Sequence, residues 1–102
     1  MATVYVTEYA RQARDAAGFT MVVADEPPLA NQTVAIGGTS AQSSAFNALT
    51  RFIRVSTDAV CSIEIGASPT ATATTRRMPA NTTEYFGVPQ GASWKIAVIT
   101  NT

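Results

Sequence analysis

The chain has 102 residues, of which seven are basic, seven are acidic and none is histidine. The charges cancel and form no basic stripe, so we expect no nucleic-acid partner. Without histidine, the commonest metal ligand and the usual general base are missing, and we expect no enzyme, no metal site and no cofactor. Charged residues make up only 14% of the chain, well below the ~25% usual in soluble proteins. We therefore expect surfaces that neighbouring molecules cover.

Two features of the sequence bear on the compartment in which the protein is made. No apolar run approaches the ~20 residues of a membrane helix, and the N-terminus lacks the basic-then-apolar pattern of a secretory signal. Cys61 is the single cysteine, and its apolar surroundings in the sequence predict a small core residue rather than a nucleophile. We expect a protein made in the cytoplasm, with no membrane partner.

Side chains that alternate between apolar and polar predict strands in the N-terminal half of the chain. Thr3–Tyr9 alternates over its whole length, whereas Ala10–Gly18 offers only alanines as apolar residues and is expected to be a loop with about one helical turn. Residues 1–14 are also expected to serve as an N-terminal arm that orders on a partner. The other strands predicted in this half are Phe19–Ala24, Asn31–Ile36 and Thr39–Asn47.

The segment Arg51–Ile65 is expected to form the centre of the fold, as two strands folded back on each other. Ile53 and Val55 share one face of the first strand, and the alternation resumes after a turn at Asp58. Asp suits a turn because its side chain can accept hydrogen bonds from nearby backbone N–H groups. The β-branched residues on the inward face are those that a packed strand favours.

The C-terminal part of the chain completes the predicted set of strands. Thr70–Arg77 is rich in threonine and is expected to be an edge strand or an extended loop, and Thr82–Val88 and Ser93–Ile99 are predicted strands. About eight short strands at intervals of about ten residues predict an all-β fold. We expect a single antiparallel domain over residues 1–102, either a β-sandwich or a barrel.

Aromatic and basic side chains are the candidates for an interface. We expect Phe52 and Trp94 in the core, whereas the three tyrosines could equally be packed or form an interface, where tyrosine is enriched. The only basic doublet is expected to be solvated rather than docked on an acidic surface. The candidate interface residues are Tyr5, Tyr9, Arg76, Arg77 and Tyr85.

Several stretches of the sequence resemble small virion-associated proteins of tailed bacteriophages. The likeness lies in CSIEIG (Cys61–Gly66), PTAT (Pro69–Thr72), the basic doublet, PANTTEYFGV (Pro79–Val88) and KIAVI (Lys95–Ile99). It implies a jelly-roll β-sandwich that decorates or cements the capsid at the virion surface. Its partners would be the major capsid protein and copies of itself, as a homo-oligomeric dimer or trimer.

Two alternative functions stay open from the sequence. The first keeps the protein in the virion but places it at the head–tail joint, in the tail or in the baseplate. The second is a glycan-binding β-sandwich module, which would need a cluster of exposed aromatic side chains. The residues that come nearest to such a cluster are Tyr85, Phe86 and Trp94.

Overall fold

The computed structural model describes residues 2–101, and in that range it contains ten strands and no helix, hence none that could span a membrane. The first five strands are β1 Thr3–Tyr9, β2 Gln12–Arg14, β3 Thr20–Ala24, β4 Ala30–Ala35 and β5 Ala41–Gln42. The other five are β6 Phe52–Thr57, β7 Cys61–Gly66, β8 Arg76–Met78, β9 Thr82–Gly87 and β10 Lys95–Thr100. The predicted all-β class is confirmed.

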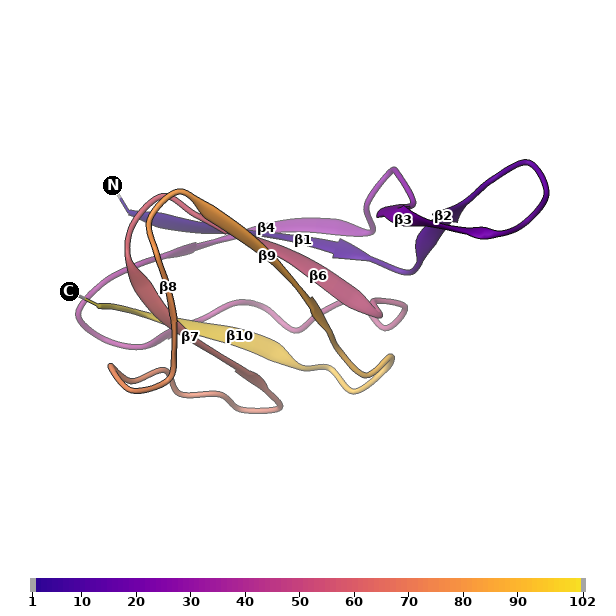
Figure 1. The fold of residues 1–102 in the computed structure, drawn as a ribbon. Coiled ribbons are helices and arrows are strands. Elements are labelled where there is room, and N and C mark those ends of the chain that lie inside the picture. The colour runs from indigo at the N-terminus through magenta and orange to yellow at the C-terminus, as the bar shows by residue number, and fades with distance from the viewer. Residues whose placement is uncertain (1, 102) are drawn as a thin grey trace.

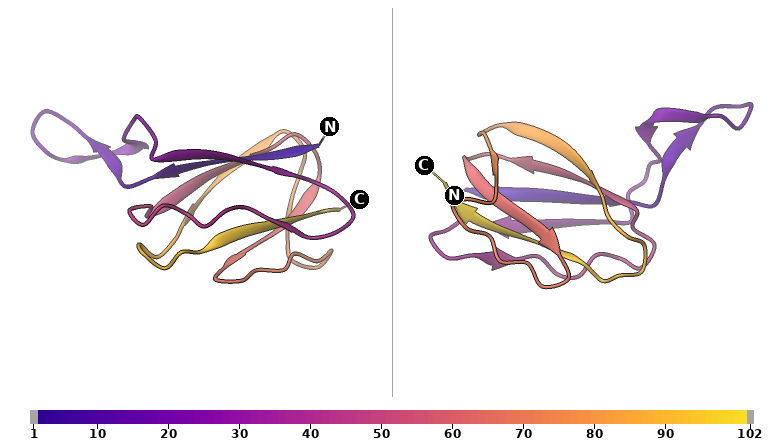
Figure 2. Two further views of the ribbon diagram at one scale, coloured as in Figure 1. Left: turned by 180° about the vertical axis from the view of Figure 1, so that it is seen from behind. Right: turned by 60° about the horizontal axis from the view of Figure 1, so that its bottom comes forward.

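The strands form three antiparallel sheets (Figure 1). The first sheet has the order β4-β1-β6-β9, and the second has the order β5-β10-β7-β8. These two sheets lie in two layers, while the two-stranded sheet β2-β3 projects beyond one end of them (Figure 2). The projection makes the molecule elongated, with extents of 48 × 27 × 21 Å.

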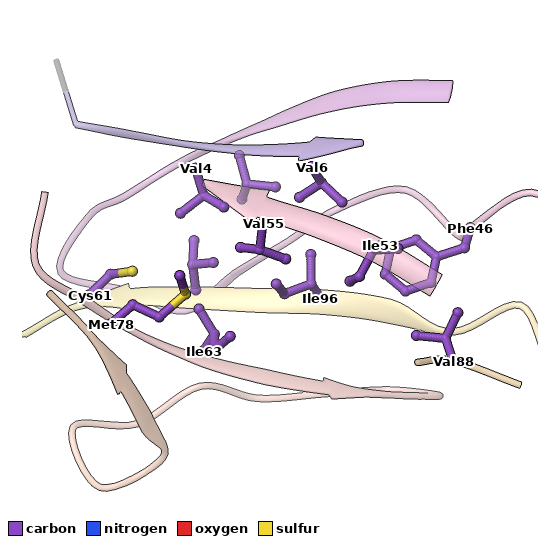
Figure 3. Close-up of a cluster of buried hydrophobic side chains, with 12 residues drawn as sticks. Val4, Val6, Phe46, Ile53, Val55, Cys61, Ile63, Met78, Val88 and Ile96 are labelled. Atoms are coloured by element: carbon purple, nitrogen blue, oxygen red, sulfur yellow. The ribbon is translucent and has the colours of Figure 1, made fainter. Parts of the chain in front are cut away.

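One hydrophobic cluster lies between the two four-stranded sheets (Figure 3). The inward residues of β6, Ile53 and Val55, are fully buried, as their alternation predicts. Cys61 is a buried free thiol, and this prediction is confirmed. The other members of the cluster are Val4, Val6, Val34, Phe46, Ile63, Met78, Val88, Ile96 and Val98. Because both sheets contribute to one cluster, the arrangement is sandwich-like and burial holds the layers together.

The N-terminal part of the chain differs from its prediction. Residues 3–9, expected to belong to an arm that orders on a partner, form β1, which pairs with β4 on one side and β6 on the other within the first sheet. Residues 10–18, expected to be a loop with a helical turn, contain the short strand β2, which pairs with β3. A pairing partner outside the segment decides this structure, and local propensity does not encode it.

Of three further predictions, those for residues 39–47 and for Phe52 were wrong, and that of an edge strand or extended loop over residues 70–77 is confirmed. Only Ala41–Gln42 of the strand expected over residues 39–47 pairs with β10. The segment 70–77 is mainly a loop, and Arg76–Met78 forms an edge strand beside β7. Phe52 lies outside the core cluster and is half-buried on the outer face of β6. Since Ile53 and Val55 occupy the inward face, the period of two requires Phe52 to point outward.

Candidate docking surface

The most distinctive feature of the molecule is the projecting hairpin, which comprises residues 11–25 with β2 and β3 (Figure 1). Its tip is ordered by Asp15, whose carboxylate accepts hydrogen bonds from the N–H groups of Ala17 and Phe19, both at 2.9 Å. Gly18 adopts a φ of 87°, a left-handed conformation that glycine allows at little cost. At the base, the Arg11 guanidinium pairs with the Asp25 carboxylate at 2.9 Å. A defined turn and a closed base make the hairpin a specific structure.

The projecting hairpin exposes large apolar side chains that nothing in residues 2–101 covers. Phe19 is 71% exposed, Met21 44%, Val22 94% and Val23 54%. A scattered apolar residue on a surface needs no explanation, whereas four within five consecutive positions are unusual, and they lie on both faces of the strand. Exposed apolar side chains gathered in this way make the hairpin a candidate site of interaction.

A buried carboxylate supports the end of the first sheet from which the hairpin emerges. Glu8 is 1% exposed. Its Oε1 accepts hydrogen bonds from the Asn47 N–H at 2.6 Å and the Thr50 hydroxyl at 2.9 Å, and its Oε2 accepts one from the Gln32 amide at 2.8 Å. One side chain therefore joins β1, β4 and the loop before β6. This hydrogen-bond network fixes the end of the first sheet from which the hairpin projects.

Three aromatic rings form a row on the outer face of the first sheet. Tyr9 stacks on Phe52 with ring centroids 5.3 Å apart, and Phe52 lies 6.3 Å from Tyr85. The Tyr9 hydroxyl donates a hydrogen bond of 2.7 Å to Glu26, which follows the hairpin. This hydrogen bond to Glu26, together with burial of the phenol, raises the pKa of Tyr9 to about 12. The row thus connects the sheet to the base of the hairpin.

An open groove of about 730 Å³ separates the projecting hairpin from the aromatic row. The residues that line it include Arg11, Arg14, Val22 and Val23 from the hairpin and Arg51, Phe52, Tyr85 and Phe86 from the sheet. No aspartate or glutamate is among the described residues that line it. The groove therefore combines apolar and cationic surface in a chain whose net charge is zero.

The structure divides the five interface candidates from the sequence between the two sheets. Tyr5 and Tyr85 are exposed on the first sheet, whereas Tyr9 is 5% exposed and packs against Phe52. Arg76 and Arg77 are exposed on β8 in the second sheet. Of the five candidates, Tyr9 and Tyr85 are brought together, because each lies beside Phe52 in the aromatic row.

The other side chains singled out in the sequence have packing roles. The guanidinium carbon of Arg76 lies 4.8 Å from the centroid of the Phe86 ring, a cation–π contact across the two sheets. Phe86 and Trp94 pack against the core cluster, so that only Tyr85 of the suggested aromatic trio is strongly exposed. These three residues therefore do not form an exposed aromatic cluster.

Sequence reasoning missed both the projecting hairpin and the role of Glu8. The sequence did contain a signal for the projecting hairpin. Met21-Val22-Val23 is an apolar run with no alternation, whereas a strand that is covered on one side needs apolar residues only at every second position. Glu8 falls on the same face of its strand as Val4 and Val6, and this position predicts that its side chain is buried. Its partners come from distant segments, and no local pattern identifies them.

Across residues 2–101, no three metal-ligating side chains lie close enough together to hold an ion. In the same range, every buried side-chain nitrogen or oxygen has a hydrogen-bond partner. What the surface does offer is shape, apolar area and positive charge. Comparison with models of protein families, with curated proteins and with solved structures yields no match to this chain.

Proposed function

We propose that this chain is a structural virion protein of a tailed bacteriophage, which decorates or cements the capsid by binding the major capsid protein. The observation that carries the proposal is the projecting hairpin, with Phe19 and Val22 71% and 94% exposed. A protein that acts by binding a larger surface needs a rigid body and an apolar projection, and it needs no reacting groups. The neutral charge and the resemblance to small virion proteins support the same role.

We further propose that the two four-stranded sheets are a jelly roll. Such a fold distributes eight strands over two sheets and moves repeatedly between them. With the hairpin set aside, the chain runs from β1 and β4 in the first sheet to β5 in the second, and back to β6. It continues through β7 and β8 in the second sheet, β9 in the first and β10 in the second. This distribution supports a jelly roll in which β1 is the strand between β4 and β6.

The test of the proposal is the position and copy number of the protein in purified particles, measured by cryo-electron microscopy and quantitative mass spectrometry. Decoration of the shell requires density on the capsid surface and a copy number comparable to that of the capsid protein. Copies confined to the tail axis would instead support a tail or head–tail joining component. Absence of the protein from purified particles would refute both roles.

Substitutions in the hairpin test the surface itself. Phe19→Ser with Val22→Thr removes apolar area that is already exposed, so the free energy of unfolding should change by less than about 0.5 kcal/mol. Burying such side chains contributes about 1.5–3 kcal/mol each, and we expect affinity for particles that lack the protein to fall at least about thirtyfold. Tyr5→Ser, a change at a residue 48% exposed on β1, is the matched control. Loss of binding in the control with full binding by the hairpin variant would assign the contact to the sheet face instead.

A further inference from the structure

The cationic side chains of this neutral chain are distributed unevenly. Three of its seven basic residues, Arg11, Arg14 and Arg51, line the groove between the projecting hairpin and the aromatic row. Arg11 is partly neutralised by Asp25 at 2.9 Å, but the groove has no carboxylate on its described walls to balance the other two. The groove is therefore an electropositive depression that would favour negative charge in whatever enters it.

The arginines retain donors for an incoming ligand. Arg14 donates one hydrogen bond of 3.4 Å to the Gly18 carbonyl, and Arg51 donates one of 3.1 Å to the Gln90 side chain. A guanidinium has five N–H donors, so several on each side chain stay available for carboxylate oxygens. Single anchoring bonds of this kind limit the positions of the two cations without using up their capacity to bind.

Apolar side chains complete the walls beside these charges. Val22 and Val23 come from the hairpin, and Phe52 and Tyr85 face them from the first sheet. A ligand that fits must therefore present carboxylates and aliphatic or aromatic groups close together. An extended peptide does this when acidic and apolar residues alternate, because its side chains point to opposite sides every ~3.3 Å.

We propose that the groove binds an extended acidic segment of the shell protein, with its carboxylates on Arg14 and Arg51 and its apolar side chains on the valines and the aromatic row. The inference rests on the proposed function and adds the chemistry of the partner. A second copy of this chain suits the groove less well, because it would bring the same three arginines to it. A nucleic acid suits it less well too, because the chain has no basic stripe along which a phosphate backbone could continue.

The test uses the full chain and labelled peptides of one design, followed by fluorescence polarisation. In the first peptide Glu alternates with Val, and in the second and third Gln or Lys replaces every Glu. We expect the Glu peptide to bind at least about tenfold more tightly than the Gln peptide, with an affinity that falls as salt rises. Equal affinity for the Glu, Gln and Lys peptides would overturn the proposal, as would tighter binding of single-stranded oligothymidylate.

Two double variants of equal charge locate the site. Arg14→Gln with Arg51→Gln should weaken binding of the Glu peptide about tenfold, whereas Arg77→Gln with Lys95→Gln, outside the groove, should leave it within about twofold. None of these four side chains is buried, and thermal melts check that both variants are folded. Equal losses in the two variants would overturn the proposal, since they would reflect net charge alone. If the free chain sediments as a dimer and this dimer does not bind the peptide, the proposal is also overturned, because a second copy would then occupy the groove.

Competition on particles separates this inference from the proposed function. The Glu peptide should displace the protein from shells, and the Gln peptide should not. If the protein decorates shells but the Glu peptide neither binds nor displaces it, the groove proposal fails and the decoration role stands. If the peptide binds but purified particles lack the protein, the decoration role fails and the chemistry of the groove stands.

Discussion

Replacement of Glu8 tests how the sheet that supports the hairpin is held together. Glu8→Ala removes the acceptor for three donors, the Asn47 N–H, the Thr50 hydroxyl and the Gln32 amide. Each donor left buried without a partner costs about 1–3 kcal/mol, and some will reach water through the space that the shorter side chain opens. We therefore expect the free energy of unfolding to fall by about 3–5 kcal/mol, a large part of the ~5–15 kcal/mol typical of a native protein.

The conservative variant Glu8→Gln should cost less, about 1–2 kcal/mol. Its amide oxygen can still accept from Asn47 and Thr50, but its NH₂ group would face the NH₂ group of Gln32. The side-chain amide of Gln32 cannot flip freely to exchange its oxygen and nitrogen, because its oxygen accepts a hydrogen bond of 2.9 Å from the Ser44 N–H. The order of stability should be wild type, then Glu8→Gln, then Glu8→Ala.

Urea unfolding measured by the fluorescence of the single tryptophan, Trp94, gives the three free energies. Glu84→Ala is the matched control, because Glu84 is exposed on β9 and its loss should change the free energy by less than about 0.5 kcal/mol. A fall of less than about 1 kcal/mol for Glu8→Ala would refute the structural role given to this carboxylate. Equal values for Glu8→Gln and Glu8→Ala would refute the part assigned to Gln32.

Two further predictions concern groups that titrate. Native Tyr9 holds its proton more tightly than an unfolded tyrosine does. The free energy of unfolding should therefore be at its full value below pH 10.0 and should fall between pH 10.0 and about 12. Absorbance titration should show one late-ionising tyrosine, and Tyr9→Phe should remove it. A titration curve that Tyr9→Phe leaves unchanged between pH 10.0 and about 12 would contradict this. Burial raises the pKa of the Cys61 thiol, so an aromatic disulfide reagent should react with it only after urea unfolds the chain; rapid reaction of the native protein would contradict the buried position.

The sequence predicted the sheet-forming segments well wherever one face had to be buried. In β6 and β7, alternation identified the strands and the inward side chains Ile53, Val55, Cys61 and Ile63. It failed where the pairing partner lies outside the segment considered, as in β2, or where few residues pair, as in β5. A period of two predicts which side chains are buried, but it does not predict which strands become neighbours.

The candidate site was much harder to predict than the fold. The sequence pointed to tyrosines, and all three lie on the outer face of the first sheet, but Tyr9 packs there and donates to Glu26. The groove is formed by residues from β2, β3, β6 and β9 and from the segments beside them, and no single stretch of sequence contains it. Only the tertiary structure brings Arg14 and Arg51 to the walls of the same groove.

The surface we propose as functional is also the place where the rules for a stable strand are broken. A two-stranded hairpin is marginally stable alone, and this one exposes Val22 and Val23 on successive positions, so both of its faces carry apolar side chains. Its order comes from the Asp15 turn and the pair of Arg11 with Asp25, neither of which needs those valines. Val22 is hardly buried in the free chain, and the partner that we propose for this surface would account for its exposure.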